Sequence, residues 1–187
     1  TFRWDYVNPR RGEWRFERFD SLMDLADRGG IKVIAVLAYD VGWIHPEGKA
    51  TRNVTPELLP LYLDYVRQVV ERYRGRVDAW EIWNEPNVTF WKGSRKDFCR
   101  LAAEAAALVK ELDPEAPLLV GATFRVDGPF IRALAAAGAF DRADALSIHP
   151  YAASPGGVSK QIEEAKGLLE ELSLRKELWI TEIGYPT

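Results

Sequence analysis

The chain has 187 residues, of which 47% are hydrophobic and 28% charged, a composition typical of one globular unit with material for a buried core. Its formal net charge is only −3 at pH 7, which excludes the basic field that dominates nucleic-acid binding. No apolar run approaches the roughly 20 residues that a membrane-spanning helix needs. We therefore expect neither nucleic acid nor a membrane span, and the single cysteine, Cys99, cannot form an internal disulfide.

Apolar segments of strand length alternate with longer segments of helical period, the pattern of βαβ units around a parallel sheet. Strands are expected at residues 1–6, 31–39, 78–84, 118–123, 145–151 and 178–183. Helices are expected between them, at about 17–28, 56–74, 95–112, 128–138 and 158–173. No repeat, low-complexity tract or flexible linker interrupts this pattern, so residues 1–187 are expected to form a single domain.

Several helix ends carry capping signals. Thr55-Pro56 combines an N-cap residue with a proline at the first helical position, and Ser94 precedes the helix expected at 95–112. Glycines stand where helices are expected to stop, at Gly29-Gly30, Gly75 and Gly138. These signals support the expected boundaries.

A doubly wound sheet and a (β/α)8 barrel both fit the alternation. The barrel is favoured because polar residues of catalytic type follow several different strands, and because no glycine-rich phosphate loop follows the first strand. The longest connection, residues 40–54, contains Trp43, His45 and Gly48 directly after a strand. In a parallel α/β fold this position lies on the ligand-binding face.

Two of the expected strands end in a glutamate, Glu85 within Asn-Glu-Pro and Glu182 within Thr-Glu-Ile-Gly. An isolated glutamate at a strand end is usually a solvated surface residue, but the two motifs in this order, three strands apart, indicate a pair. Hydrolysis of an acetal needs one acid to protonate the leaving oxygen and a second carboxylate to meet the oxocarbenium-like carbon. We therefore interpret Glu85 as acid/base and Glu182 as nucleophile. Strand alternation predicts that both point inward, together with Ala79, Glu81, Trp83, Leu178 and Ile180.

The chain resembles glycoside hydrolase clan A, the retaining barrel glycosidases with catalytic glutamates on strands four and seven, and especially its cellulase-like and family 39 xylosidase-like members. The resemblance covers essentially the whole chain and rests on residues 3–5, 80–87, 147–151 and 179–187. If residues 80–85 are strand four, residues 178–182 count forward as strand seven. The resemblance thus implies that barrel strands two to seven are visible, with the first and last missing, and that the domain is truncated at both ends.

The resemblance also implies roles for further residues. Asn84 matches the asparagine that binds the sugar 2-hydroxyl, and His149 and Tyr151 match residues that line the site and help to orient the nucleophile. Arg3 matches an arginine near the nucleophile, although an ion pair with Glu81 inside the barrel is an equal alternative. His149 could instead be a core histidine without a role.

The tryptophans divide into two expected groups. Trp43, Trp83 and Trp91 are expected near the mouth of the barrel, where they could stack on sugar rings. Trp4, Trp80 and Trp179 are expected on outward faces, packed under helices. With two histidines and one cysteine, we expect no transition-metal site, and no cofactor is implied.

The sequence thus predicts a retaining glycoside hydrolase that acts on an oligosaccharide or polysaccharide through a covalent glycosyl-enzyme intermediate. β-Linked xylosides or glucosides are the expected substrates. The alternatives are a catalytically silent carbohydrate-binding barrel and a barrel lyase or aldolase, the latter disfavoured because no lysine ends a predicted strand. Cellular location stays open, although the resemblance is compatible with an extracellular parent protein.

Overall fold

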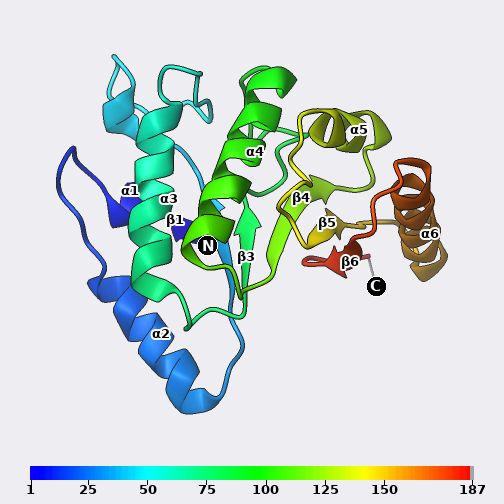
Figure 1. The fold of residues 1–187 in the computed structure, drawn as a ribbon, viewed down its shortest axis with the longest axis horizontal. Helices are drawn as coiled ribbons and strands as arrows, with labels where there is room; N and C mark the ends of the chain where they lie inside the picture. The colour runs from blue at the N-terminus through cyan, green and yellow to red at the C-terminus, as the bar shows by residue number, and fades with distance from the viewer. Residues whose placement is uncertain (186–187) are drawn as a thin grey trace.

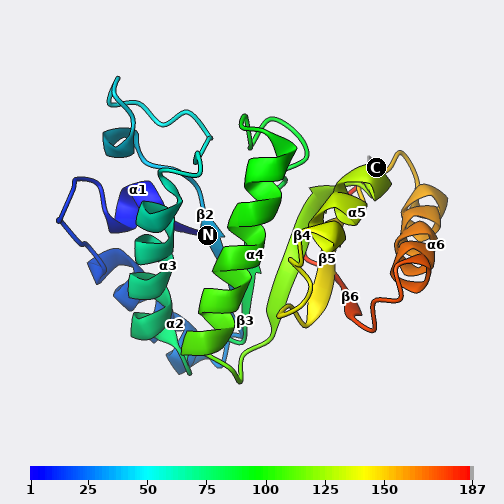
Figure 2. The same cartoon turned by 45° about the horizontal axis from the view of Figure 1, so that its top comes forward.

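A computed structural model describes residues 1–185 and shows six parallel strands that form one sheet. The strands are β1 (Phe2–Arg3), β2 (Ile34–Ala38), β3 (Ala79–Ile82), β4 (Leu118–Phe124), β5 (Ala145–His149) and β6 (Glu177–Ile180). Each strand pairs with its neighbours in sequence, so the spatial order is β1-β2-β3-β4-β5-β6 (Figures 1 and 2). This order confirms the α/β class and matches consecutive units of a (β/α)8 barrel; the strand order of a doubly wound sheet reverses.

The helices follow the strands around the sheet, from α2 and α3 near β1 and β2 to α6 near β6 (Figures 1 and 2). They are α1 (Trp4–Val7), α2 (Glu17–Gly29), the 3-10 turn η1 (Gly42–Ile44), α3 (Leu59–Tyr73), α4 (Arg95–Leu112), α5 (Gly128–Ala136) and α6 (Pro155–Glu171). The predicted cap at Ser94 is confirmed, since its hydroxyl accepts the Asp97 N–H at 3.0 Å. At Thr55 the prediction is wrong, because the Leu58 and Leu59 N–H groups both donate to the Thr55 carbonyl, forming a turn that delays α3 to Leu59.

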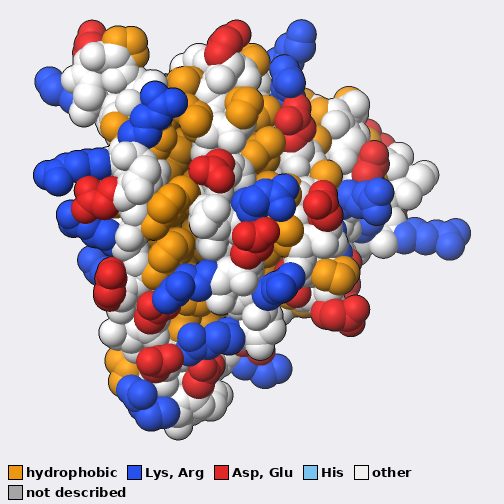
Figure 3. All heavy atoms as spheres, turned by 60° about the vertical axis from the view of Figure 1, so that its left-hand side comes forward, with side chains coloured by type: hydrophobic (Ala, Val, Ile, Leu, Met, Phe, Trp, Pro, Cys, Tyr) orange, Lys and Arg blue, Asp and Glu red, His pale blue; other side chains and the backbone are white. Residues whose placement is uncertain are grey.

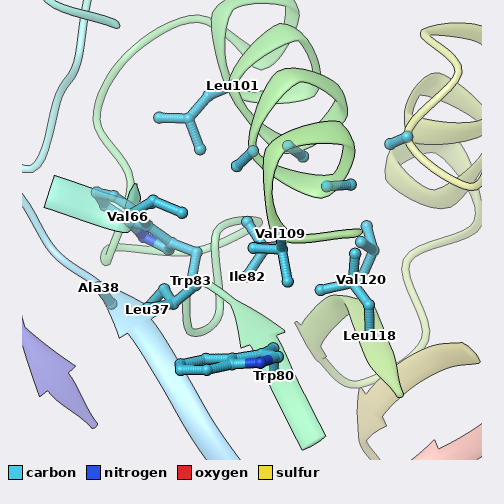
Figure 4. Packing of buried hydrophobic residues seen from close by; sticks show 14 of the residues in the cluster. Leu37, Ala38, Val66, Trp80, Ile82, Trp83, Leu101, Val109, Leu118 and Val120 are labelled. Atoms are coloured by element: carbon cyan, nitrogen blue, oxygen red, sulfur yellow. The ribbon is translucent and has the colours of Figure 1, made fainter. Parts of the chain in front are cut away.

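The main core lies between the sheet and the helices. Figure 4 shows Trp80, Ile82 and Val120 of the strands packed beneath Val109 of α4 and Val66 of α3. The buried tyrosines of this layer keep their hydroxyls bonded, as burial of a phenol requires. The Tyr62 hydroxyl donates to the Leu37 carbonyl at 2.8 Å, and the Tyr65 hydroxyl donates to the Phe2 carbonyl. These bonds fasten α3 to the start of the sheet.

The first predicted strand, residues 1–6, is wrong beyond Arg3, because α1 begins at Trp4. Trp4 is buried and stacks on Tyr65 with ring centroids 5.4 Å apart, and its indole N–H donates to the Asn8 side chain at 3.3 Å. Burial of this ring under α3 therefore outweighs the strand-like alternation of the sequence. As a result, only Phe2 and Arg3 of this segment lie in the sheet.

The side chains of β6 face the opposite sides of the sheet from those predicted. Trp179 packs on Ala79, Leu119 and Ala145 on the inner face of the sheet, whereas Leu178 packs against the helix-side core. A shift of one residue reverses every side chain of a strand, and the apolar sequence Leu-Trp-Ile does not reveal which face is which. Trp179 is therefore an inner residue. The outward positions predicted for Trp4 and Trp80 are confirmed by their burial in the helix-side core.

The outer surface carries both signs of charge. Figure 3 shows Lys and Arg side chains interspersed with Asp and Glu over the face formed by the first helices, with apolar atoms between them. Many are paired, as in the contacts of Arg72 with Asp20 and of Arg76 with Asp24, at 2.6 and 2.7 Å. Among the described residues, the helices all lack the combination of length and apolar character needed to cross a bilayer.

A bulge in β4 links the sheet to the region where the strands end. The register of β4 against β5 shifts between Val120 and Thr123, and Gly121 and Ala122 take positive φ angles of 127° and 45°. The Ala122 N–H donates to the Ser147 hydroxyl at 2.9 Å, and the Ala122 carbonyl accepts the Glu85 N–H at 2.8 Å. The bulge therefore fixes the backbone of Glu85 relative to β5.

Gly121→Ala is expected to destabilise the protein by about 2 kcal/mol or more, because an added Cβ meets the Ser147 carbonyl oxygen at 2.5 Å and the φ angle disfavours a side chain. Chemical denaturation of the full-length protein measures this change. Gly167→Ala on α6 is the matched control, since nothing lies within 4 Å of its added Cβ, and we expect it to stabilise by roughly 0.5–1 kcal/mol. Equal effects of the two substitutions would contradict the steric account of the bulge.

Candidate active site

Glu85 is positioned by irregular backbone after β3. The strand ends at Ile82, and Trp83 and Glu85 both adopt left-handed φ angles, 65° and 45°. Such conformations are costly for residues with side chains and persist only where the surroundings impose them. Here the imposed contact is the bond from the Glu85 N–H to Ala122. The Glu85 side chain is consequently held in a nearly buried position, 12% exposed.

Glu182 approaches the same region from the segment after β6. The strand ends at Ile180, and the segment that follows is tied to the end of β5 by a bond from the Ala152 N–H to the Gly184 carbonyl at 3.2 Å. The Tyr151 hydroxyl donates to Oε2 of Glu182 at 3.2 Å. The side chain of Glu182 is 44% exposed, so one carboxyl of the pair is open to an incoming ligand.

His149, at the end of β5, lies between the two carboxyl groups. Its Nδ1 is 3.0 Å from Oε1 of Glu85 and 3.7 Å from Oε2 of Glu182. One oxygen of Glu85 and one of Glu182 lie within 4.8 Å of each other. The structure thus brings together the two predicted glutamates and both predicted neighbours, His149 and Tyr151. The imidazole is 1% exposed and bonded on both nitrogens, so it is not a core histidine without polar partners.

Behind His149 lies a second group of polar side chains that the sequence analysis missed. The Thr181 hydroxyl is 3.1 Å from His149 Nε2 and donates to Glu81 Oε1 at 2.9 Å. Ser147 lies beside the Glu81 carboxyl, and burial raises the pKa of this carboxyl above the ordinary value. Thr181 escaped attention because the predicted facing of the last strand turned it outward. Once the facing of β6 is corrected, the sequence predicts that the Thr181 hydroxyl points inward, to the same side of the sheet as Glu81.

Asn84 lies beside an aromatic wall. Its side chain lies near Tyr39, whose ring stacks on Phe90 with centroids 5.7 Å apart. Both rings are partly buried, and burial raises the pKa of the Tyr39 hydroxyl. Tyr39 was the last residue of a predicted strand, a position that could have marked it as a site residue, whereas Phe90 had no such signal. The wall stands next to the Glu85 end of the site.

Two of the three tryptophans predicted to stack on sugar lie in the core. Trp83 is 0% exposed and Trp91 is 6% exposed, and the two rings pack edge to face with centroids 5.3 Å apart. The left-handed φ of Trp83 breaks strand alternation and turns its ring toward the helices, so neither ring offers a free face and the prediction is wrong for both. Trp43 is partly buried with its indole N–H bonded to the Asn8 carbonyl at 2.9 Å, and its role stays a prediction.

Arg3 does not form either of its expected ion pairs. Within the described residues its carboxylate partner is Asp5, at 2.6 Å, and its guanidinium lies over the Tyr6 ring. The turn into α1 brings Asp5 back toward Arg3, and this local partner replaces both Glu81 and Glu182. A role for Arg3 in substrate binding stays a prediction.

Glu85, His149 and Glu182 also form the group of described side chains whose atoms could share a metal ion. The same three groups can instead exchange protons, because each carboxyl faces an imidazole nitrogen within 4 Å. Metal binding and proton transfer both fit this geometry, and the similarity of the chain to known proteins distinguishes between them.

A sequence profile described as glycosyl hydrolase family 10 matches residues 1–103. A β-1,4-xylanase of Dictyoglomus thermophilum is 26% identical over 127 residues, which cover 62% of this chain. A family 39 glycoside hydrolase structure from Bacteroides cellulosilyticus aligns with 98% of the chain at a TM-score of 0.73 and 28% identity. A family 39 β-xylosidase structure from Caulobacter crescentus aligns with the whole chain at a TM-score of 0.75 and 20% identity, a likeness of fold.

These matches confirm the predicted resemblance to clan A, to which families 10 and 39 both belong. The profile points to family 10, whereas the resemblance inferred from the sequence motifs was to cellulase-like and family 39 members. The aligned regions amount to 34% of the xylanase, 42% of the Bacteroides chain and 46% of the Caulobacter chain. The chain thus spans less than half the length of each.

Glu81 is expected to make stability depend on pH. Because burial raises the pKa of its carboxyl, the folded protein holds this proton more tightly than the unfolded chain does. The free energy of unfolding of the parent, measured relative to Glu81→Gln, should therefore fall as the pH rises above 4.5, the ordinary value, and through the raised pKa. Denaturant titrations between acidic and neutral pH test this, with the exposed Glu164→Gln on α6 as control. A difference that grows with pH would contradict it.

Proposed function

Because the chain belongs to glycosyl hydrolase family 10, we propose that Glu85 and Glu182 are the catalytic pair of a retaining glycoside hydrolase. The observation that carries this proposal is their separation, one oxygen of each lying within 4.8 Å of the other. Retaining enzymes place the two carboxyl groups roughly 5–5.5 Å apart, whereas inverting enzymes leave roughly 6.5–9.5 Å for a water molecule. The short separation supports direct attack by one carboxylate on the sugar.

In the first step, an oxygen of Glu182 bonds to the anomeric carbon while the bond from that carbon to the glycosidic oxygen breaks. The electron pair of the broken bond stays on the leaving oxygen, which takes the proton of Glu85. Glu182 suits attack because its carboxyl is accessible, and the Tyr151 hydroxyl holds one of its oxygens. Glu85 suits proton donation because its backbone and carboxyl are both anchored.

In the second step, water adds to the anomeric carbon and its proton passes to the Glu85 carboxylate. The bond between that carbon and Glu182 breaks, and its electron pair returns to Glu182, which restores the starting state. Two inversions leave the anomeric configuration unchanged. The same carboxyl therefore acts as acid and then as base, which requires it to stay in one place throughout.

We assign xylan or xylo-oligosaccharides as the substrate class. The supporting observation is that the Dictyoglomus and Caulobacter relatives are named a β-1,4-xylanase and a β-xylosidase. We assign binding of the sugar 2-hydroxyl to Asn84, directly before the acid/base, as the family resemblance implies. The neighbouring Tyr39 and Phe90 rings offer an apolar surface for a pyranose. The alternative, a silent carbohydrate-binding barrel, leaves the paired carboxyls and their anchoring bonds without a purpose.

Glu182→Ala should reduce turnover of an aryl β-xyloside by about 10⁴-fold or more, because the attacking carboxylate is gone. Added azide should restore part of the rate and give a glycosyl azide of inverted configuration, since a small anion fills the space of the lost carboxylate. Steady-state kinetics of the full-length protein measure this, with Glu164→Gln as control. Turnover without azide close to that of the parent would remove Glu182 from the chemistry.

Glu85→Ala should slow aryl β-xylosides by about 10²- to 10⁴-fold when the leaving group is poor, and far less when it is good, because only poor leaving groups need protonation. A series of aryl xylosides of graded leaving-group acidity measures this dependence. A mutant-to-parent rate ratio that stays constant across the series would show that Glu85 is not the acid.

A further inference from the structure

The long connection after β2, residues 40–54, is folded around the buried carboxyl of Asp40. Oδ2 of Asp40 accepts the N–H groups of Thr51 and Arg52, at 2.7 and 2.9 Å. The same oxygen lies 2.8 Å from Nε2 of His45. These contacts bring the later part of the connection back to its start, which directly follows the aromatic wall of the site. The mechanism proposed above gives this connection no role.

Arg52 is held in a left-handed conformation within this connection. Its φ angle is 60°, which is costly for a residue with a side chain and persists only where the surroundings impose it. The imposing bonds run from its N–H to Asp40 and from the Lys92 N–H to its carbonyl at 2.8 Å. Its guanidinium lies over the Phe90 ring, 5.1 Å from the centroid, and Nη1 donates to the Thr89 carbonyl at 2.9 Å. Both the backbone and the side chain of this exposed arginine are therefore anchored.

The Arg52 guanidinium stands at the Glu85 end of the site. Its partner ring Phe90 stacks on Tyr39, and the Tyr39 hydroxyl is near both Arg52 and Glu85. The proposed catalytic residues are both acidic, and the formal net charge of the chain is −3. A sugar chain that carries negative charge is repelled by such a site unless a cation lies close by. Arg52 supplies a cation at this place.

Three arginines lie near the site, and they differ in how their donors are used. Nε and Nη2 of Arg3 both donate to Asp5, at 2.9 and 2.6 Å. Nε of Arg125 donates to the Tyr151 carbonyl at 3.0 Å. Arg52 donates from its side chain through Nη1, so within the part of the chain that the structure describes its Nε–Nη2 edge is free. Such an edge matches the two oxygens of a carboxylate, which it binds with two parallel hydrogen bonds.

We propose, on the basis of the glycosidase function proposed above, that Arg52 is a specificity-determining residue that binds the carboxylate of a uronic acid carried by the xylan chain. The planar guanidinium supplies the charge and the paired donors, and the aromatic wall beside it offers an apolar surface to the sugar. The substrate is thereby narrowed from xylan in general to xylan with acidic side groups. The contact is non-covalent and leaves both steps of the mechanism unchanged.

The test compares two substrates that differ only in the carboxylate. The first is a xylo-oligosaccharide with one glucuronic acid side group, and the second is the same molecule after chemical reduction of that group to glucose. The full-length protein should cleave the acidic substrate with a kcat/KM about tenfold higher, the size of effect that one charge-assisted contact produces. Arg52→Gln should remove this preference. A parent protein without the preference, or an Arg52→Gln variant that keeps it, would overturn the inference.

Two further variants separate the guanidinium from charge in general. Arg52→Lys keeps the charge but lacks the paired donors, so it should retain only part of the preference. Arg28→Gln removes the same charge from an exposed position at the end of α2, before β2 begins, and should keep the preference of the parent. Equal losses in Arg28→Gln and Arg52→Gln would show that the net charge of the chain causes the preference, which would also overturn the inference.

Binding supplies a readout that needs no turnover. Calorimetric titration of full-length Glu182→Ala should give a Kd about tenfold lower for the acidic oligosaccharide than for its reduced form, and added salt should narrow the difference. The double variant Glu182→Ala/Arg52→Gln should bind both forms equally. Equal binding of the two forms by Glu182→Ala itself would contradict the proposal. Failure of the glycosidase proposal looks different, because the parent would then cleave neither substrate.

Discussion

The site depends on the contact between His149 and Glu85, because this 3.0 Å bond joins the ends of two strands that are not neighbours in the sheet. β4 lies between β3 and β5 and carries the bulge at Gly121 and Ala122. The bulge binds the Glu85 backbone on one side and the Ser147 hydroxyl on the other. Replacing this irregular segment by regular strand would remove both anchors, which explains why strained backbone is found here.

The two carboxyl groups of the proposed mechanism have different surroundings. Glu85 is nearly buried and held by backbone and imidazole, whereas Glu182 is largely open and held by one phenol. This difference matches the roles proposed for them. A group that must give and take protons at one position benefits from anchoring, and a group that must bond to a sugar carbon must be reachable.

The alternation of strands and helices predicted the fold, since a parallel sheet needs a crossover of helical length after every strand. Glu85 and Glu182 were also accessible from the sequence, because the carboxyl ends of parallel strands meet at one edge, and the family resemblance pointed to His149 and Tyr151. The sequence did not show which side chains of β6 face inward, since Leu178, Trp179 and Ile180 are all apolar and only Thr181 is polar. Trp83 was misplaced for another reason: its left-handed backbone ends the alternation on which the prediction rested.

The most direct test of the account is to trap the covalent intermediate. A 2-deoxy-2-fluoro-β-xyloside with a good leaving group slows the second step more than the first, so the sugar should accumulate on the attacking carboxyl of the full-length protein. Peptide mass spectrometry should then find the fluorosugar on Glu182. A label on Glu85 or on Glu81 would contradict the account, as would cleavage of xylosides with inversion and no labelled peptide.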